Sequence, residues 1–154
     1  HHSGFSFHYH LENTGEKEII TDEYVHNFIA LNHQDIGTSY ILRFPFQLRT
    51  EAFGAAVNPE DKVHFQQHEI KFNGTPAVVF FFSHLNGEEQ VNATWELVHA
   101  DSKIGIREIG SFTTDKVNLW GREHVISPEL FFKVSIKPGQ SSKWSRKYEL
   151  FYET

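Results

Sequence analysis

The two residues with the clearest capacity for acid–base chemistry are a histidine and a glutamate far apart in the chain. His26 lies in a stretch with apolar residues on both faces, where burying an unpaired imidazole would cost about 1–3 kcal/mol. It must therefore bond to a partner in the core or face a wet cavity. Glu129 follows Pro128 and precedes an apolar run, and a carboxylate beside apolar packing can have a raised pKa and act as a general base. The alternative is an ordinary surface glutamate.

A second pair of histidines, His8 and His10, shares one face of an expected strand. Such a pair could bind a metal if His26, Glu12 or His99 supplied a third ligand. Most pairs of this kind are solvated, and the sequence fixes no complete ligand set. We therefore predict no metal and no other cofactor, and treat His8 and His10 as candidates for substrate binding.

Four more residues are candidates for substrate binding because of where they lie in the sequence. Two lie within two residues of His26 in the sequence, and the other two come shortly before Glu129. The tryptophans of the chain could offer aromatic rings to a ligand, although in so aromatic a chain they are more often core residues. The four candidates are Tyr24, Asn27, Trp120 and His124.

Alternation with period two predicts strands along almost the whole chain. Around His26 it places Tyr24 and Phe28 on the histidine's face, and Val25 and Asn27 on the other. Because both faces carry apolar side chains, we expect this strand to be central and little exposed. With no convincing helix, the pattern predicts an all-β fold, an antiparallel β-sandwich. The expected strands are 5–12, 18–32, 40–48, 63–72, 77–83, 91–99, 103–113, 116–120, 130–136 and 143–152.

Several stretches, taken in order, resemble the galactose mutarotase-like (aldose 1-epimerase) family. The resemblance covers most of residues 5–152 and is most specific at its two ends. Near the start it includes an "NTG" turn and the histidine-bearing stretch, and near the end a "PE" segment and a "PG" hairpin before a tryptophan. The stretches are Asn13-Thr14-Gly15, Glu23–Asn32, Ser127–Phe132, Lys137–Gln140 and Trp144–Leu150.

The resemblance implies a fold and a set of roles. The family fold is a β-supersandwich about twice as long, so the chain resembles its C-terminal half. In the family, a glutamate takes the proton of the anomeric hydroxyl while a histidine protonates the ring oxygen, so the sugar ring opens and recloses with inverted configuration. By this resemblance Glu129 would be the base and His26 the acid. The family's N-terminal half supplies further sugar-holding residues, which leaves a non-catalytic β-sandwich interaction or accessory module as the alternative.

Composition narrows the classes of partner. The formal charge of −6 without a basic cluster argues against nucleic acid, and no apolar run is long enough to span a membrane. The absence of cysteine excludes disulfides and leaves the compartment open. We expect residues 1–3 to be a tag remnant and residues 4–154 to form one domain. The expected ligand is a small sugar. Open sheet edges should be covered by a second copy or by another polypeptide.

Overall fold

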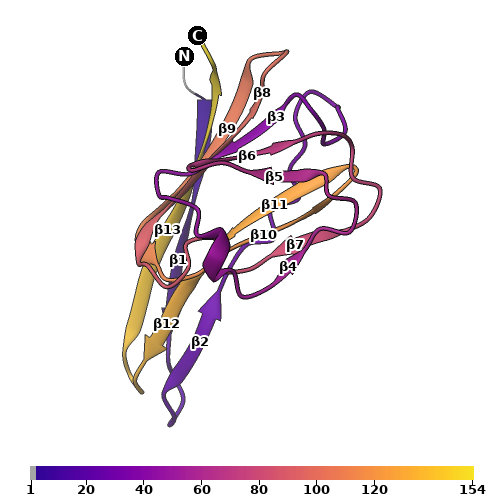
Figure 1. The fold of residues 1–154 in the computed structure, drawn as a ribbon. Coiled ribbons are helices and arrows are strands. Elements are labelled where there is room, and N and C mark those ends of the chain that lie inside the picture. Colours follow the sequence, from indigo (N-terminus) through magenta and orange to yellow (C-terminus); the bar gives the residue numbers. More distant parts are fainter. Residues whose placement is uncertain (1–2) are drawn as a thin grey trace.

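The computed structural model describes residues 3–154 and has three antiparallel sheets in two layers (Figure 1). One layer is a seven-stranded sheet. The other is a four-stranded sheet continued by a two-stranded ribbon, which extends to one end of the molecule. The prediction of an all-β antiparallel sandwich is confirmed. His1 and His2, two of the three residues of the expected tag remnant, lie outside the described residues.

The large sheet brings the first and last strands of the chain side by side. From edge to edge it consists of β1 (Ser3–Glu12), β13 (Ser141–Tyr152), β9 (Ile104–Thr114), β8 (Val91–His99), β3 (Tyr40–Arg43), β6 (Glu69–Phe72) and β5 (Val63–Phe65). The four-stranded sheet consists, in spatial order, of β11 (Val125–Leu130), β10 (Val117–Arg122), β7 (Phe80–Phe82) and β4 (Ala56–Val57). The ribbon pairs β12 (Phe132–Ile136) with β2 (Ile19–Glu23), and one 3₁₀ turn, η1 (Thr50–Ala52), lies before β4.

The hydrophobic core fills the space between the two layers. The seven-stranded sheet contributes buried Leu42, Trp95 and Leu97, and the four-stranded sheet contributes Phe80 and Leu119. A smaller cluster of Val134, Ile136 and Trp144 holds the ribbon against the large sheet. The alternation seen in the sequence therefore corresponds to the inward faces of two packed sheets.

The prediction of one long central strand over 18–32 is wrong. Strand β2 ends at Glu23, and in the next nine residues only Ile29 pairs with a strand, opposite Ile126. The alternation itself is present, because Tyr24 and Phe28 are exposed whereas Val25 and Asn27 are partly buried. The segment thus lies along β11 as a covering chain instead of a ladder strand.

The missing ladder has a cause in the opposite strand. Ile29 pairs with Ile126 in the same register as Glu23 with Phe132, so Asn27 lies opposite Pro128. A proline has no N–H to donate to a ladder. The Asn27 side chain instead donates to the Pro128 carbonyl at 2.6 Å, and its backbone N–H donates to Ser127 Oγ at 2.9 Å. Side-chain groups therefore replace the ladder bonds at this point.

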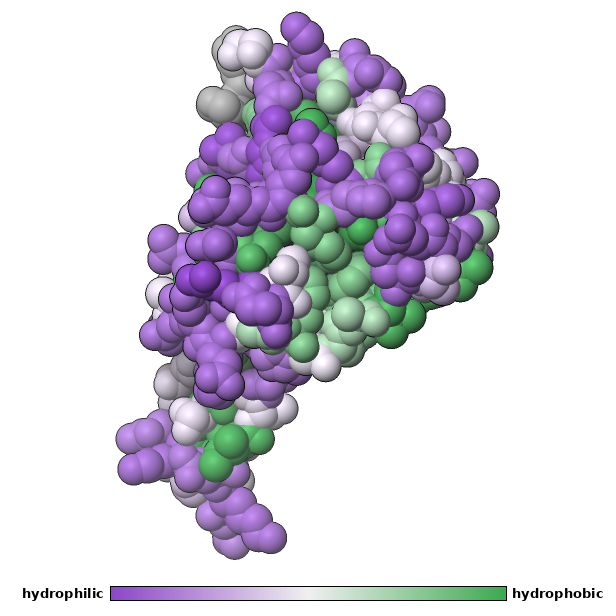
Figure 2. Space-filling view, viewed as in Figure 1, coloured by the Kyte–Doolittle hydropathy of each residue, from purple (hydrophilic) through white to green (hydrophobic). Residues whose placement is uncertain are grey.

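Polar side chains cover most of the surface in the view of Figure 2. Apolar side chains gather in the middle of this face, around η1 and β4, where Val57 is 48% exposed. No helix of residues 3–154 is long and apolar enough to cross a membrane.

Strand β1 forms an open edge of the large sheet, and its outer side lacks a partner strand among residues 3–154. Phe5 and Phe7 on this strand are 53% and 51% exposed. A long apolar edge is a template for pairing with another chain. We therefore expect a second copy or another polypeptide to pair with β1.

Light scattering of the purified chain at high concentration tests the second-copy version of this expectation. We expect a dimer, and Phe7→Lys should shift it toward the monomer because a charged lysine blunts an edge strand. Lys147→Gln on the neighbouring strand is the control for a change in surface charge. A monodisperse monomer for the unmodified chain would remove the second copy as the covering partner.

Candidate functional site

The structure brings His26 and Glu129 together although they are far apart in the sequence. Ser127 and Glu129 lie on the same face of β11, and the register of the covering segment puts His26 opposite Glu129. His26 Nδ1 lies 3.4 Å from Glu129 Oε1 and 2.8 Å from Ser127 Oγ. The result is a histidine, a serine and a glutamate in mutual contact at the edge of the smaller sheet.

The two titratable side chains differ sharply in exposure. The His26 side chain is 36% exposed, whereas the Glu129 side chain is 6% exposed. Burial raises the pKa of Glu129 to about 7, against smaller opposing contributions from the Ser127 hydrogen bond and the Lys116 charge. This carboxyl therefore exchanges protons near neutral pH, as a general base or acid must.

The hydrogen bonds at Ser127 determine which nitrogen of His26 carries a hydrogen. Ser127 Oγ accepts the N–H of Asn27 and donates to Glu129 Oε1 at 3.4 Å. With its only hydrogen used in this way, the hydroxyl must accept the Nδ1 hydrogen of His26 in their 2.8 Å contact. In the neutral imidazole, Nε2 is then the nitrogen without a hydrogen and the one that can accept a hydrogen bond.

Aromatic rings surround the histidine. Phe28 stacks on His26 with 4.0 Å between ring centroids, and Trp120 meets it edge-on at 5.2 Å. Tyr24 lies 6.4 Å from the imidazole and stacks on Phe131. Phe28 is 53% exposed and has a φ of 46°, a costly backbone conformation for a bulky residue. These rings offer apolar faces beside the His26 imidazole and the Glu129 carboxyl.

Asn27 points away from this surface, toward the large sheet. Its side chain donates to Glu108 at 3.2 Å and accepts a hydrogen bond from the Tyr148 hydroxyl at 2.9 Å. Burial and the nearby Glu108 carboxylate raise the pKa of Tyr148, so its hydroxyl stays protonated and donates. Asn27 therefore anchors the segment that carries His26, and its side chain is not directed toward a ligand there.

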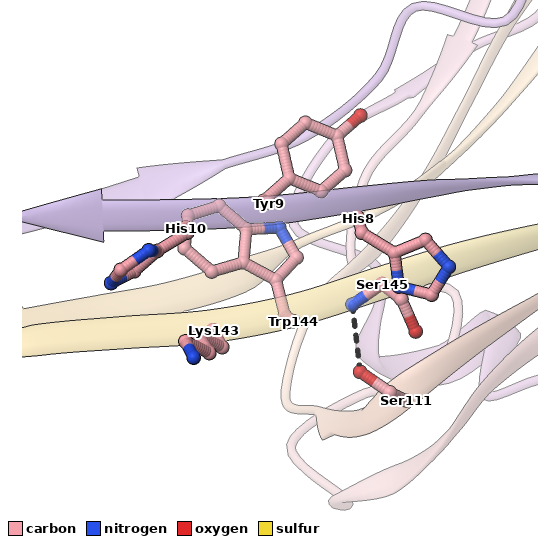
Figure 3. Close-up of a pocket in the computed structure, with 7 residues that line it drawn as sticks. All are labelled: His8, Tyr9, His10, Ser111, Lys143, Trp144 and Ser145. Carbon is pink, nitrogen blue, oxygen red and sulfur yellow. Dashed lines mark hydrogen bonds between the residues drawn. The ribbon is translucent and has the colours of Figure 1, made fainter.

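His8 and His10 lie on the opposite face of the large sheet. On the neighbouring strand β13 they lie opposite Ser145 and Lys143, whose side chains project from the same face of the sheet. Tyr148, an odd number of residues away along β13, projects from the other face and bonds to Asn27. The two histidines line an open depression of about 470 Å³ with Lys143 and Ser111, shown in Figure 3. The structure thus separates them from His26.

His124 is also separate from His26, in the turn between β10 and β11. Its Nδ1 lies 2.9 Å from Asp35, and its Nε2 lies 3.5 Å from Glu123. Ligand atoms of these three residues lie within 4.8 Å of one another, a spacing that could hold a metal ion. However, the two carboxylates contact opposite nitrogens of one ring, which suits an ion pair better than one shared metal.

Sequence reasoning missed Ser127 and Phe28 as members of the site. Each had a usable signal: Phe28 shares the face of His26 in the alternation, and Ser127 is two residues before Glu129, on the same strand face. Arg146 and Glu108, which lie behind Asn27, were missed as well. Arg146 lies two residues from both Trp144 and Tyr148 on β13, so it shares their inward face.

Burial of the Glu129 carboxyl predicts a pH dependence of stability. Since its pKa is raised in the folded protein, the folded state keeps this proton between about pH 4.5 and 7, while the unfolded state loses it. Stability should therefore fall as pH rises through this window, by on the order of 3 kcal/mol from this group.

The comparison of Glu129→Gln with the unmodified protein isolates this contribution. Melts from pH 4 to 8 should show the variant gaining relative stability as pH rises, with the difference constant above about pH 7. The control is Glu51→Gln at the exposed 3₁₀ turn. A difference independent of pH would contradict the raised pKa.

Comparison with known proteins identifies the fold. No family model and no curated protein sequence matches the chain. A proposed aldose 1-epimerase from Klebsiella pneumoniae superposes with a TM-score of 0.66 at 12% identity, over 97% of this chain and 43% of that one. A galactose mutarotase related enzyme from Lactobacillus acidophilus gives 0.53 at 9% identity, over 97% and 57%.

The same sandwich also occurs in a different setting. A TPR-domain containing protein from Parabacteroides distasonis superposes with a TM-score of 0.55 at 6% identity, over 98% of this chain and 28% of that one. The chain spans about half the length of the epimerase and mutarotase structures. At these identities the likeness concerns the fold, which is a β-sandwich of the galactose mutarotase type.

Proposed function

We propose that this domain interconverts the anomers of a small sugar by general acid–base chemistry at His26 and Glu129. The observation that carries the proposal is the 3.4 Å contact between a partly exposed imidazole and a buried carboxyl whose pKa is raised to about 7. Opening and closing a hemiacetal requires one general acid and one general base, and an imidazole beside a carboxyl supplies both. The related fold of the epimerase and mutarotase structures supports the same reaction class.

Each group has a defined task in this reaction. Ionised Glu129 removes the proton of the anomeric hydroxyl, while Nε2 of protonated His26 donates a proton to the ring oxygen. The bond between the anomeric carbon and the ring oxygen breaks, giving the open-chain aldehyde. Rotation about the adjacent carbon–carbon bond and the reverse proton transfers close the ring with the other configuration. The reaction is an isomerisation, so no proton is gained or lost overall.

Ring opening followed by ring closure leaves both groups in their starting states. After ring opening, Glu129 holds a proton and His26 has given one up from Nε2. On ring closure, Glu129 returns its proton to the anomeric oxygen and Nε2 takes back the proton of the hydroxyl that becomes the ring oxygen. The Nδ1 hydrogen stays bonded to Ser127 Oγ throughout, at 2.8 Å, and keeps the imidazole in place. Tyr24, Phe28 and Trp120 would pack against the apolar face of the sugar ring.

Proton NMR of freshly dissolved α-galactose and α-glucose tests the proposal. We expect the protein to accelerate the approach to anomeric equilibrium, and His26→Asn or Glu129→Gln to reduce the enzymatic rate by about 10²–10⁴-fold. The double variant should lose little more than the weaker single variant, because the two groups act as a unit.

His124→Asn is the matched control, since His124 is a paired histidine outside the site. It should keep the unmodified rate. Equal rates with and without the unmodified protein, across several sugars, would exclude the epimerase activity.

A second candidate is sugar binding without turnover, as a non-catalytic accessory module. It is favoured by the exposed rings of Tyr24 and Phe28 beside His26, which can pack against a sugar whether or not proton transfer follows. Titration calorimetry separates the two functions. An accessory module should bind sugar through the exposed aromatic rings with unchanged affinity in Glu129→Gln, and should leave the rate of anomer exchange at the solvent value.

A further inference from the structure

The segment that carries His26 is held mainly by side chains. Its backbone is paired up to Glu23 in β2 and again at Ile29, but residues 24–28 form no ladder. A histidine on such a backbone needs other restraints, because acid–base chemistry depends on placing the proton donor accurately. The restraints on the side facing the large sheet come from Glu23 and Asn27, three residues before and one residue after His26.

Both restraints end on one buried ion pair. Arg146 donates to Glu23 at 2.7 Å, to the Leu130 carbonyl at 2.9 Å and to Glu108 at 2.8 Å. Glu108 also accepts from Asn27 at 3.2 Å. The side chains of Arg146 and Glu108 are both 0% exposed. One guanidinium and one carboxylate thus hold the chain on either side of His26.

Two tryptophans donate further hydrogen bonds to the carboxylates of Glu108 and Glu23. Trp95 Nε1 donates to Glu108 at 2.8 Å, and Trp144 Nε1 donates to Glu23 at 3.0 Å. Arg146 uses both terminal nitrogens, while its Nε has no hydrogen-bond partner among residues 3–154. The pair thus joins β9 to β13. Indole rings of the large sheet hold the carboxylates around it, Trp95 on β8 bonding to Glu108 and Trp144 on β13 bonding to Glu23.

We propose that Arg146 and Glu108 are positioning residues that fix His26 against Ser127 and Glu129 by tethering Glu23 and Asn27. Their significance for catalysis rests on the proposed function, whereas the positioning itself can be measured without activity. Stability alone does not account for such a pair. Replacing a buried ion pair with well-packed apolar side chains is often neutral or stabilising. An apolar pair, however, could not bond to Glu23 and Asn27.

Arg107, on the same strand as Glu108, provides a matched control for Arg146. It neighbours Glu108 but faces the other side of the sheet, where it pairs with Glu96 at 3.2 Å and lies over the Phe151 ring. Arg107→Met and Arg146→Met therefore make the same chemical change on opposite faces. If positioning depends on the buried pair, only Arg146→Met should move His26.

NMR contacts between the His26 and Trp120 rings give a direct readout, since their centroids are 5.2 Å apart in the unmodified protein. We expect nuclear Overhauser effects between these rings to weaken or vanish in Arg146→Met and to persist in Arg107→Met. Anomer exchange catalysed by Arg146→Met should fall by roughly 10²-fold, mainly in kcat, because the acid is displaced. Unchanged contacts in Arg146→Met would overturn the proposal.

A double variant separates positioning from stability. Glu108→Met with Arg146→Met removes both buried charges, so its melting temperature should recover relative to the single variant. The contacts of His26 with Trp120 should nevertheless stay lost. Recovery of these contacts together with the melting temperature would assign the pair a purely structural role and overturn the proposal.

Asn27→Leu keeps the test decisive if the charge variants do not fold. It removes the tether to Glu108 together with the Asn27 bonds to Pro128 and Tyr148, and leaves Arg146 and Glu108 bonded to each other. We again expect the His26 contacts with Trp120 to weaken, and unchanged contacts would count against positioning. If the unmodified protein does not accelerate anomer exchange, the proposed function fails, while the ring contacts still decide whether the pair positions His26.

Discussion

The need to compensate one buried positive charge organises the centre of this sandwich. Arg146 is fully buried, and burial alone would lower its pKa, but hydrogen bonds to Glu23 and Glu108 outweigh that effect and raise it. A charge removed from water must be surrounded by acceptors with good geometry. Meeting that requirement draws Glu108 from β9, Glu23 from the end of β2 and the carbonyl of Leu130 from β11 to one point. The two layers are thereby fixed relative to each other.

For the segment that carries His26, the sequence predicted which side chains share a face better than it predicted the hydrogen bonds of the backbone. Alternation correctly put Tyr24 and Phe28 on one side and Asn27 on the other, because alternation depends on local burial. Pairing depends on the strand opposite. That strand contributes Pro128, about a hundred residues away, and the loss of its N–H breaks the ladder. A proline just before a candidate glutamate could have signalled an edge strand, but not the segment that covers it.

The candidate site was predictable in part. His26 and Glu129 were singled out from their sequence context and lie in contact. His8 and His10 could not be separated from them by sequence, since alternation gives two faces of a strand without saying which face of a sheet is covered. The buried pair of Arg146 and Glu108 depends on a contact across neighbouring strands, which no local pattern specifies.

The covering segment also has a consequence for how the protein behaves in solution. Strand β11 is an edge of the smaller sheet, and the chain from Tyr24 to Leu31 shields it while forming few ladder bonds of its own. Loops laid over strand edges are one way in which proteins avoid intermolecular pairing. Release of this segment would uncover β11 at the same moment as it dismantled the contact of His26 with Glu129. Order at the site and resistance to aggregation are therefore maintained by the same stretch of chain.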